Sequence, residues 1–124
     1  MSEVLASFSV DDIGAAKRFY GDTLGLDVAG GGDDRGPLWL QVAGGQRRVL
    51  IYPKPDHTPA SFTVLNVMVE DFERAVDDLV TRGVLIDTFD AYESDARGIH
   101  RAGGLSVAWF RDPAGNVVSV GQEH

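Results

Sequence analysis

The chain repeats itself at close to half its length. Residues 10–26 read VDDIGAAKRFYGDTLGL and residues 69–84 read VEDFERAVDDLVTRGV. Val10 aligns with Val69, an offset of 59 residues, and an acidic pair, a helix-like segment and a glycine follow in both copies. A repeat of this size indicates one supersecondary unit that occurs twice. Any fold for this chain must therefore contain two copies of that unit.

Each copy predicts the same order of elements. An extended segment comes first, at 4–10 and again at 61–69. The acidic pair that follows is suited to capping a helix N-terminus and to facing its dipole. In the second copy, apolar residues recur at helical spacing from Phe72 onward, which predicts one buried stripe. Gly25 and Gly83 stand where helices commonly end.

Short strands complete each copy. We expect them near 26–30, 37–43 and 47–52 in the first copy and near 84–89, 105–111 and 116–121 in the second. The polar, glycine-containing segment between residues 89 and 105 predicts a long loop. The sequence thus predicts an α+β protein of one domain, residues 1–124, with two βαβββ modules at about 1–55 and 61–124.

Composition excludes several classes of partner and site. The 19 acidic and 11 basic residues give a net charge of −8, whereas nucleic acids and anionic membranes favour clustered Lys and Arg. There is no cysteine, so disulfides and thiolate metal sites are excluded. The sequence shows neither a signal peptide nor an apolar run of ~18 residues. We therefore expect no nucleic-acid partner, no membrane partner and a cytoplasmic location.

The two copies resemble the modules of the vicinal oxygen chelate superfamily. VDDIGAAKRFYGDTLGL is similar to its first module, and AWFRDPAGNVVSV, at 108–120, to the closing strands of its second. The superfamily includes glyoxalase I, extradiol dioxygenases and bleomycin-resistance proteins. The resemblance implies the glyoxalase/bleomycin resistance/dioxygenase fold, in which two modules form a curved mixed sheet around a cup-shaped cavity. It also implies a homodimer.

The resemblance further implies four metal-ligand positions, which hold His, Glu or Gln in metal-dependent relatives. On this chain they fall on Leu5, Val64, Ser119 and a residue near Ile51, with Leu50 or Tyr52 as alternatives after a slip of one residue. A divalent ion needs several converging nitrogen, oxygen or thiolate donors, and one hydroxyl among aliphatic side chains does not supply them. The three histidines show no ligand spacing. We therefore expect no metal and no cofactor.

Strand parity predicts a set of cavity-facing residues. Side chains alternate between the two faces of a strand, so positions two residues from the four above should also face the cavity. The expected ligand-binding residues are Leu5, Ser7, Ser9, Ile51, Phe62, Val64, Asn66, Met68, Trp109 and Ser119. Trp109 belongs to this set only if its strand turns it inward. Apolar walls with few polar groups are typical of small-molecule sites, although Ser and Asn in strands also bond neighbouring backbone.

Three functions follow, in order of preference. The first is a metal-independent binding protein for a small organic molecule; a cationic or aromatic one suits the acidic charge and the Trp and Phe residues. The second is a metal-independent lyase or isomerase that uses His100 or Glu93 of the long loop, unless His100 is simply exposed. The third is a metal-dependent glyoxalase or dioxygenase-type enzyme whose ligands lie elsewhere.

Overall fold

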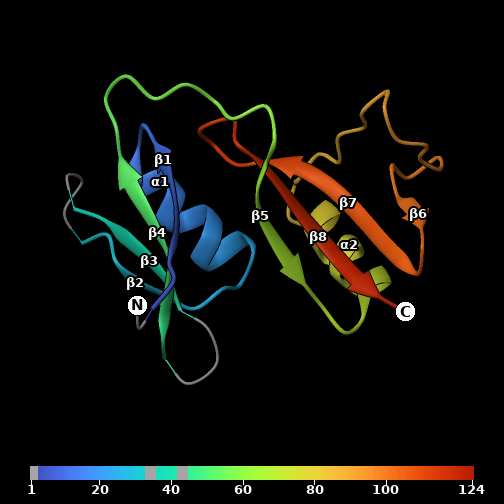
Figure 1. Ribbon diagram of the computed structural model, residues 1–124, viewed down its shortest axis with the longest axis horizontal. Helices are drawn as coiled ribbons and strands as arrows, with labels where there is room; N and C mark the ends of the chain where they lie inside the picture. The colour runs from blue at the N-terminus through green and yellow to red at the C-terminus, as the bar shows by residue number, and fades with distance from the viewer. Residues whose placement is uncertain (1–2, 33–35, 42–44) are drawn as a thin grey trace. The chain divides into compact units, whose positions relative to one another are not determined.

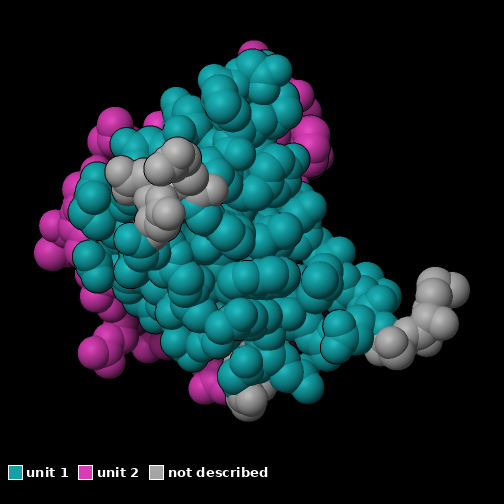
Figure 2. All heavy atoms as spheres, turned by 90° about the vertical axis from the view of Figure 1, so that its left-hand side faces the viewer, with its two compact units in different colours: residues 1–59 teal, residues 60–124 magenta. Residues whose placement is uncertain are grey.

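A computed structural model describes residues 3–32, 36–41 and 45–124 (Figure 1). The chain divides into two units, residues 1–59 and 60–124, which Figure 2 colours separately. Each unit holds a four-stranded sheet, with strand order β1-β4-β3-β2 in the first and β5-β8-β7-β6 in the second. In each sheet the first strand of the unit pairs in parallel with the last. The α+β class and the two βαβββ modules predicted from the repeat are confirmed.

In the first unit, the described strands are β1 (Ala6–Val10), β2 (Val28–Gly30), β3 (Leu38–Gln41) and β4 (Arg47–Pro53). The helix α1 (Ile13–Lys17) continues directly into the π-helical turn η1 (Arg18–Thr23). Tyr20 of η1 is fully buried, and its ring centroid lies 5.9 Å from that of Phe8 in β1. This contact marks the side of the sheet that the helix covers. The predicted strand at 37–43 includes residues 42 and 43, which lie outside the described residues.

The second unit repeats this arrangement with β5 (Thr63–Met68), α2 (Phe72–Thr81), β6 (His100–Ala102), β7 (Leu105–Arg111) and β8 (Val117–Glu123). The helix α2 buries its apolar stripe, which includes Phe72 and Val76. The side chain of Gln122 in β8 joins sheet to helix: its Oε1 accepts from the Phe72 N–H at 3.0 Å, and its Nε2 donates to the Glu70 carbonyl at 2.6 Å. Since Val118 and Val120 share the side of β8 that carries Gln122, the face they occupy is the helix-covered one.

Both helices begin and end as the sequence predicts. Asp12 and Asp71 each accept a hydrogen bond on the side chain from the backbone N–H three residues further on. Gly25 has φ of +70° and Gly83 has φ of +90°, in the left-handed region that glycine adopts without a steric cost. Among the described residues, no helix is long and apolar enough to cross a bilayer.

The prediction of a strand at 84–89 is wrong. Only Asp87 pairs with the sheet, in an isolated bridge to Trp109, and pairing with β7 resumes at His100 opposite Val107. Residues 88–99 therefore leave the sheet, and β6 forms inside the segment predicted as a loop. Further along this segment, the Asp95 carboxylate accepts from the N–H groups of residues 97 and 99 and closes a local turn in place of a ladder.

The segment 88–99, which leaves the sheet and is called the excursion below, supplies a test of the fold at its C-terminal end. Gly98 has φ of +86°, and a Cβ there would lie 2.7 Å from Cγ2 of Ile86. Gly83 has φ of +90° and open space around it, which makes it a matched control. We expect Gly98→Ala to lower the free energy of unfolding by roughly 2–4 kcal/mol, and Gly83→Ala by only about 1–2 kcal/mol, because the first adds a clash to the same backbone strain. Urea denaturation measures both, and equal losses would contradict the contact with Ile86.

Candidate functional site

A row of side chains crosses the helix-free face of the second sheet. In the strand register, Asn66 lies opposite Ser119, Ser119 opposite Trp109, and Trp109 opposite Asp87. Paired positions point to the same face of a sheet, and this face is the one opposite Val118. Asn66, Ser119 and Trp109 thus share one face, which fixes the strand parity that the sequence left open for Trp109. Whether they bind a ligand stays a prediction.

A second row lies two residues further along the strands. It runs from Met68 to Gly121, Val107 and His100. Gly121 has no side chain, and Met68 is 52% exposed. The face therefore combines the buried Val107 and the exposed Met68 with the polar and aromatic groups of the first row.

Ser119 is buried and uses its proton within the sheet. Only 1% of the residue's surface is exposed, and the Ser119 Oγ donates a hydrogen bond to Oδ1 of Asn66 at 2.7 Å. The Nδ2 group of Asn66 makes no hydrogen bond to any residue that the structure describes, and Asn66 is exposed. The pair therefore satisfies the buried hydroxyl and leaves an amide donor at the surface of the same face.

An aromatic cluster surrounds Trp109. The ring centroid of Phe89 lies 5.5 Å away, edge-on at 89°, while those of Tyr92 and His100 lie 5.3 and 5.8 Å away, both inclined at 31°. All three rings come from residues 88–100, the excursion and the start of β6. Sequence reasoning did not place Phe89 and Tyr92 in the site. Two aromatic residues in an otherwise polar loop were the available signal.

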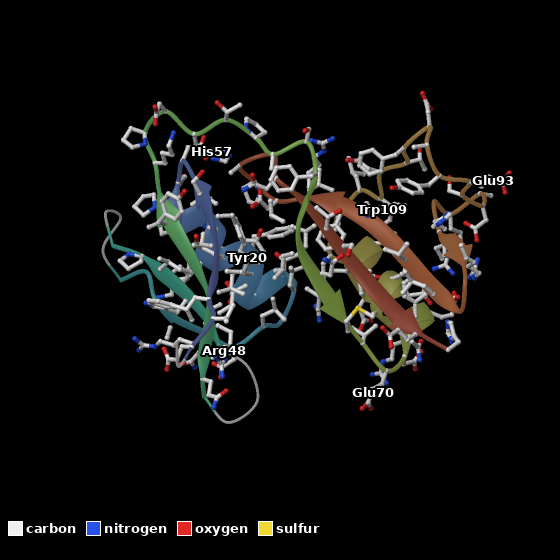
Figure 3. The ribbon with its side chains drawn as sticks, in the orientation of Figure 1. Tyr20, Arg48, His57, Glu70, Glu93 and Trp109 are labelled. Atoms are coloured by element: carbon white, nitrogen blue, oxygen red, sulfur yellow. The ribbon has the colours of Figure 1, made fainter. Side chains whose placement is uncertain are left out.

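The orientation of His100 is set by a backbone carbonyl. Its Nδ1 lies 2.5 Å from the carbonyl oxygen of Glu93. A carbonyl only accepts, so Nδ1 carries the proton and Nε2 holds the lone pair of the neutral ring. The Glu93 side chain is exposed, and Figure 3 shows Glu93 at the outer margin of the excursion, away from Trp109. His100 thus reaches the face, whereas the Glu93 carboxylate does not.

Ion pairs fasten the excursion to α2. Arg97 donates to Glu73 at 2.7 Å and also to Asp77, while Arg101 donates to Glu73 at 2.9 Å and to Asp95 at 2.8 Å. Hydrogen bonds from the Ile99 N–H and from Arg101 hold the pKa of the Asp95 carboxyl below its usual value. The network joins the root of the excursion to a helix that packs on the opposite face of the sheet from Trp109.

The first unit has a corresponding row. Ser7 lies opposite Leu50, and Leu50 opposite Trp39, as Asn66, Ser119 and Trp109 do in the second unit. Ile51 lies opposite Phe8 and is fully buried on the helix-covered face. The expectation that Ile51 shares a face with Ser7 and Ser9 is therefore wrong by one residue, because the register puts Leu50 and Tyr52 beside those serines.

The remaining predicted residues lie at strand ends or irregularities. Leu5 and Phe62 come just before β1 and β5 and are 49% and 68% exposed. Val64 lies at an irregularity in the β5–β8 register, where Thr63 pairs with Val117 but Leu65 pairs with Val118. Ser9 bonds to His57, with Oγ and Nδ1 2.6 Å apart, so this histidine of the linker is engaged.

The side chains at the four implied ligand positions do not fit a metal ion. Leu5, Val64 and Ile51 are hydrocarbons, as is the alternative Leu50, and the Ser119 hydroxyl already donates to Asn66. Within the residues described, no group of three or more His, Asp or Glu side chains is placed to hold a metal. No step of a reaction can therefore be derived through a metal at these positions.

Comparison with known proteins identifies the family. The model of the Glyoxalase/Bleomycin resistance protein/Dioxygenase superfamily matches residues 4–120. The chain belongs to this superfamily. The resemblance seen in the sequence is thus confirmed, and with it the fold that places the two rows. No curated protein sequence matches the chain.

Several solved structures resemble the chain over its length. TnmS3, an antibiotic-binding protein from Streptomyces sp. CB03234, is 29% identical, with a TM-score of 0.69 over 100% of this chain and 99% of its own. A glyoxalase/bleomycin resistance protein from the same organism is 27% identical, with a TM-score of 0.67 over 99% of this chain and 100% of its own. Lactoylglutathione lyase from Agrobacterium tumefaciens, at 20% identity, a TM-score of 0.64 and coverage of 98% and 94%, shares the fold.

The Ser119–Asn66 hydrogen bond can be measured by a double-mutant cycle. We expect Ser119→Ala and Asn66→Ala to show a coupling energy of about 1 kcal/mol in urea denaturation, because either change removes the same bond. A control cycle pairs Ser119→Ala with Ser61→Ala, since Ser61 is exposed, and its coupling should be near zero. Coupling of equal size in both cycles would show that the contact does not join the strands.

Proposed function

We propose that the chain is a metal-independent binding protein for a small organic molecule, which lies on the helix-free face of the second sheet. The observation that carries this proposal is the row of Asn66, Ser119 and Trp109, with its aromatic ring and free amide donor on one face. Apolar and aromatic walls with a few directed polar groups are typical of such sites. The whole-length similarity to TnmS3, an antibiotic-binding protein, supports binding as the function.

The ligand that suits this face is planar, aromatic and neutral or cationic. Trp109 offers an indole ring for stacking, and Asn66 offers two N–H donors. The Asp87 carboxylate lies at the end of the row, with Arg111 donating to it at 3.0 Å. The net charge of −8 favours the approach of cations over that of anions. A cation over the Trp109 ring would add a cation–π contribution.

Metal independence is supported by the residue types at the four implied ligand positions. A site that retained metal chemistry would need donors there, and a serine that already donates its proton to a neighbouring amide is a poor one. Binding that uses hydrogen bonds and stacking requires none of these donors.

A metal-independent lyase or isomerase is the second candidate, and His100 is the observation that favours it. The Glu93 carbonyl fixes Nε2 as the basic nitrogen of the ring, beside Trp109. A base in that position could remove a proton from a bound molecule. The exposed Glu93 carboxylate has no corresponding position, so of the two loop groups His100 is the one that reaches this face.

Binding can be tested with single-tryptophan variants. The chain has two tryptophans, so Trp39→Phe leaves Trp109 as the only indole and Trp109→Phe leaves Trp39. The probes are size-matched planar aromatic cations and anions. We expect cations to quench Trp109 fluorescence in the Trp39→Phe variant. Trp109→Phe should weaken binding about five- to ten-fold, since an aromatic contact contributes about 1 kcal/mol, and calorimetric titration measures this change.

Two further measurements separate the functions. Treatment with a chelator should leave binding unchanged, and loss of binding on chelation would contradict metal independence. Mass spectrometry of the bound probe detects turnover, and turnover that His100→Gln abolishes would favour the enzyme. If Trp39→Phe weakens binding as much as Trp109→Phe does, the probes do not bind specifically at the second sheet, which would contradict the proposed site.

We also propose that the chain forms a homodimer. β1 and β5 are edge strands, and apolar side chains at or beside them are exposed: Leu5 at 49%, Phe62 at 68% and Met68 at 52%. Unpaired edges with apolar side chains favour association. Light scattering at micromolar concentration should give twice the chain mass of 13.3 kDa. A mass of one chain would contradict the dimer. The cytoplasmic location stays a prediction.

A further inference from the structure

Among the described residues, the backbone of the segment 88–99 pairs with the sheet only on either side of its two ends. Asp87 bridges to Trp109, and His100 resumes the ladder opposite Val107, the residue two positions earlier in β7. Between these points the described backbone hydrogen bonds are local, from Tyr92 to Phe89 and within the turn from Asp95 to Ile99. We call residues 88–99 the strap.

The strap is held more firmly at its root than at its tip. At the root, Ile99 is 2% exposed, and the Asp95 side chain accepts from its N–H at 3.0 Å. At the tip, Phe89 and Tyr92 contact Trp109 through their rings, and the Glu93 carbonyl accepts from His100. Tyr92 remains 51% exposed. Few buried contacts and few backbone hydrogen bonds are typical of segments that open locally.

Glu73 is the centre of the ion pairs that hold the root. Its Oε2 accepts from Arg97 and its Oε1 from Arg101, so one carboxylate on α2 holds two arginines, one in the strap and one in β6. The side chains of Glu73, Arg97 and Arg101 are 55%, 44% and 50% exposed. Such pairs are individually weak and are screened by salt, and only their combination in one network favours a single geometry.

We propose that the strap swings off Trp109 to admit a ligand, and that Glu73 is the latch that sets how often it opens. The statement that opening admits a ligand rests on the proposed function, whereas the opening itself is a property of the free protein. Within the part of the chain that the structure describes, the ion-pair partners of Glu73 are Arg97 and Arg101, so Glu73 acts by positioning the strap. The aromatic rings over Trp109 then serve as a removable cover rather than as a permanent part of the core.

The test uses the free protein in the Trp39→Phe background, where Trp109 is the only tryptophan. Glu73→Gln removes the negative charge of the Glu73 side chain, and Arg101→Gln removes one of the two arginines that pair with it. Asp78→Asn is the matched control: Asp78 is also an exposed acid of α2, and its side chain has no ion pair among the described residues. Two readouts are taken, hydrogen exchange of the Gly98 and Ile99 amides and quenching of Trp109 by acrylamide.

We expect Glu73→Gln and Arg101→Gln to speed exchange of the root amides about two- to five-fold, the range that losing one or two exposed ion pairs produces. Acrylamide quenching of Trp109 should rise in the same variants, and Asp78→Asn should match the parent. Sodium chloride at about 1 M should reproduce the effect in the parent but add little to Glu73→Gln.

Three results would overturn the proposal. Unchanged exchange in both latch variants would show that Glu73 does not hold the strap. Faster exchange without greater quenching would show that the root loosens while Trp109 stays covered. A rise shared by the Val120 amide in the middle of β8 would show global loosening rather than strap opening. Because no ligand is used, failure of the probes to bind would leave these results standing and would count only against the proposed function.

Discussion

The pairing of β8 between β5 and β7 is the constraint on which the second unit depends. β8 is parallel to β5 and antiparallel to β7, so each of its residues selects one neighbour on either side. Val118 and Val120 then face α2, and Ser119 faces away between Asn66 and Trp109. A shift of one residue would exchange the two faces and would expose the residues that α2 buries. The burial of the α2 stripe thus fixes the composition of the opposite face.

The same constraint acts in the first unit, where β4 lies between β1 and β3. There the corresponding row holds Ser7, Leu50 and Trp39, and Arg47 lies 5.9 Å from the centre of the Trp39 ring. The two copies keep a tryptophan at the same place in the sheet but surround it differently. In the first unit a cationic side chain approaches the ring, and in the second the strap supplies aromatic rings. A duplicated frame has in this way acquired two chemically distinct faces.

How far sequence reasoning reached depends on whether the deciding contacts are local. The helix caps at Asp12 and Asp71 involve residues three apart, and the repeat identified them. The face of Ile51 depends on its register with Phe8, more than forty positions away, which alternation alone does not fix. The strand expected at 84–89 had a suitable apolar pattern. Only Asp87 of that segment pairs with the sheet, and the turn at Asp95 and the ion pairs to Glu73 that follow it are not visible as periodicity. The aromatic cluster around Trp109 is likewise non-local.

The two faces of each sheet have different roles, which explains how the family fold is kept here with side chains at the four implied positions that do not fit a metal ion. The stability of each sheet comes largely from the helix-covered face, where Phe8 and Ile51 or Val118 and Phe110 are buried. Residues of the helix-free face contribute less to that core and can change with function.

Ser119 shows the limit of this freedom. It is buried on the helix-free side, so its hydroxyl needs a partner, and Asn66 provides one. A carboxylate in its place would need a cation or a proton instead, and no basic side chain stands opposite it in the register. The serine and the asparagine therefore form one polar unit, which satisfies the buried hydroxyl and places an amide donor on the helix-free face.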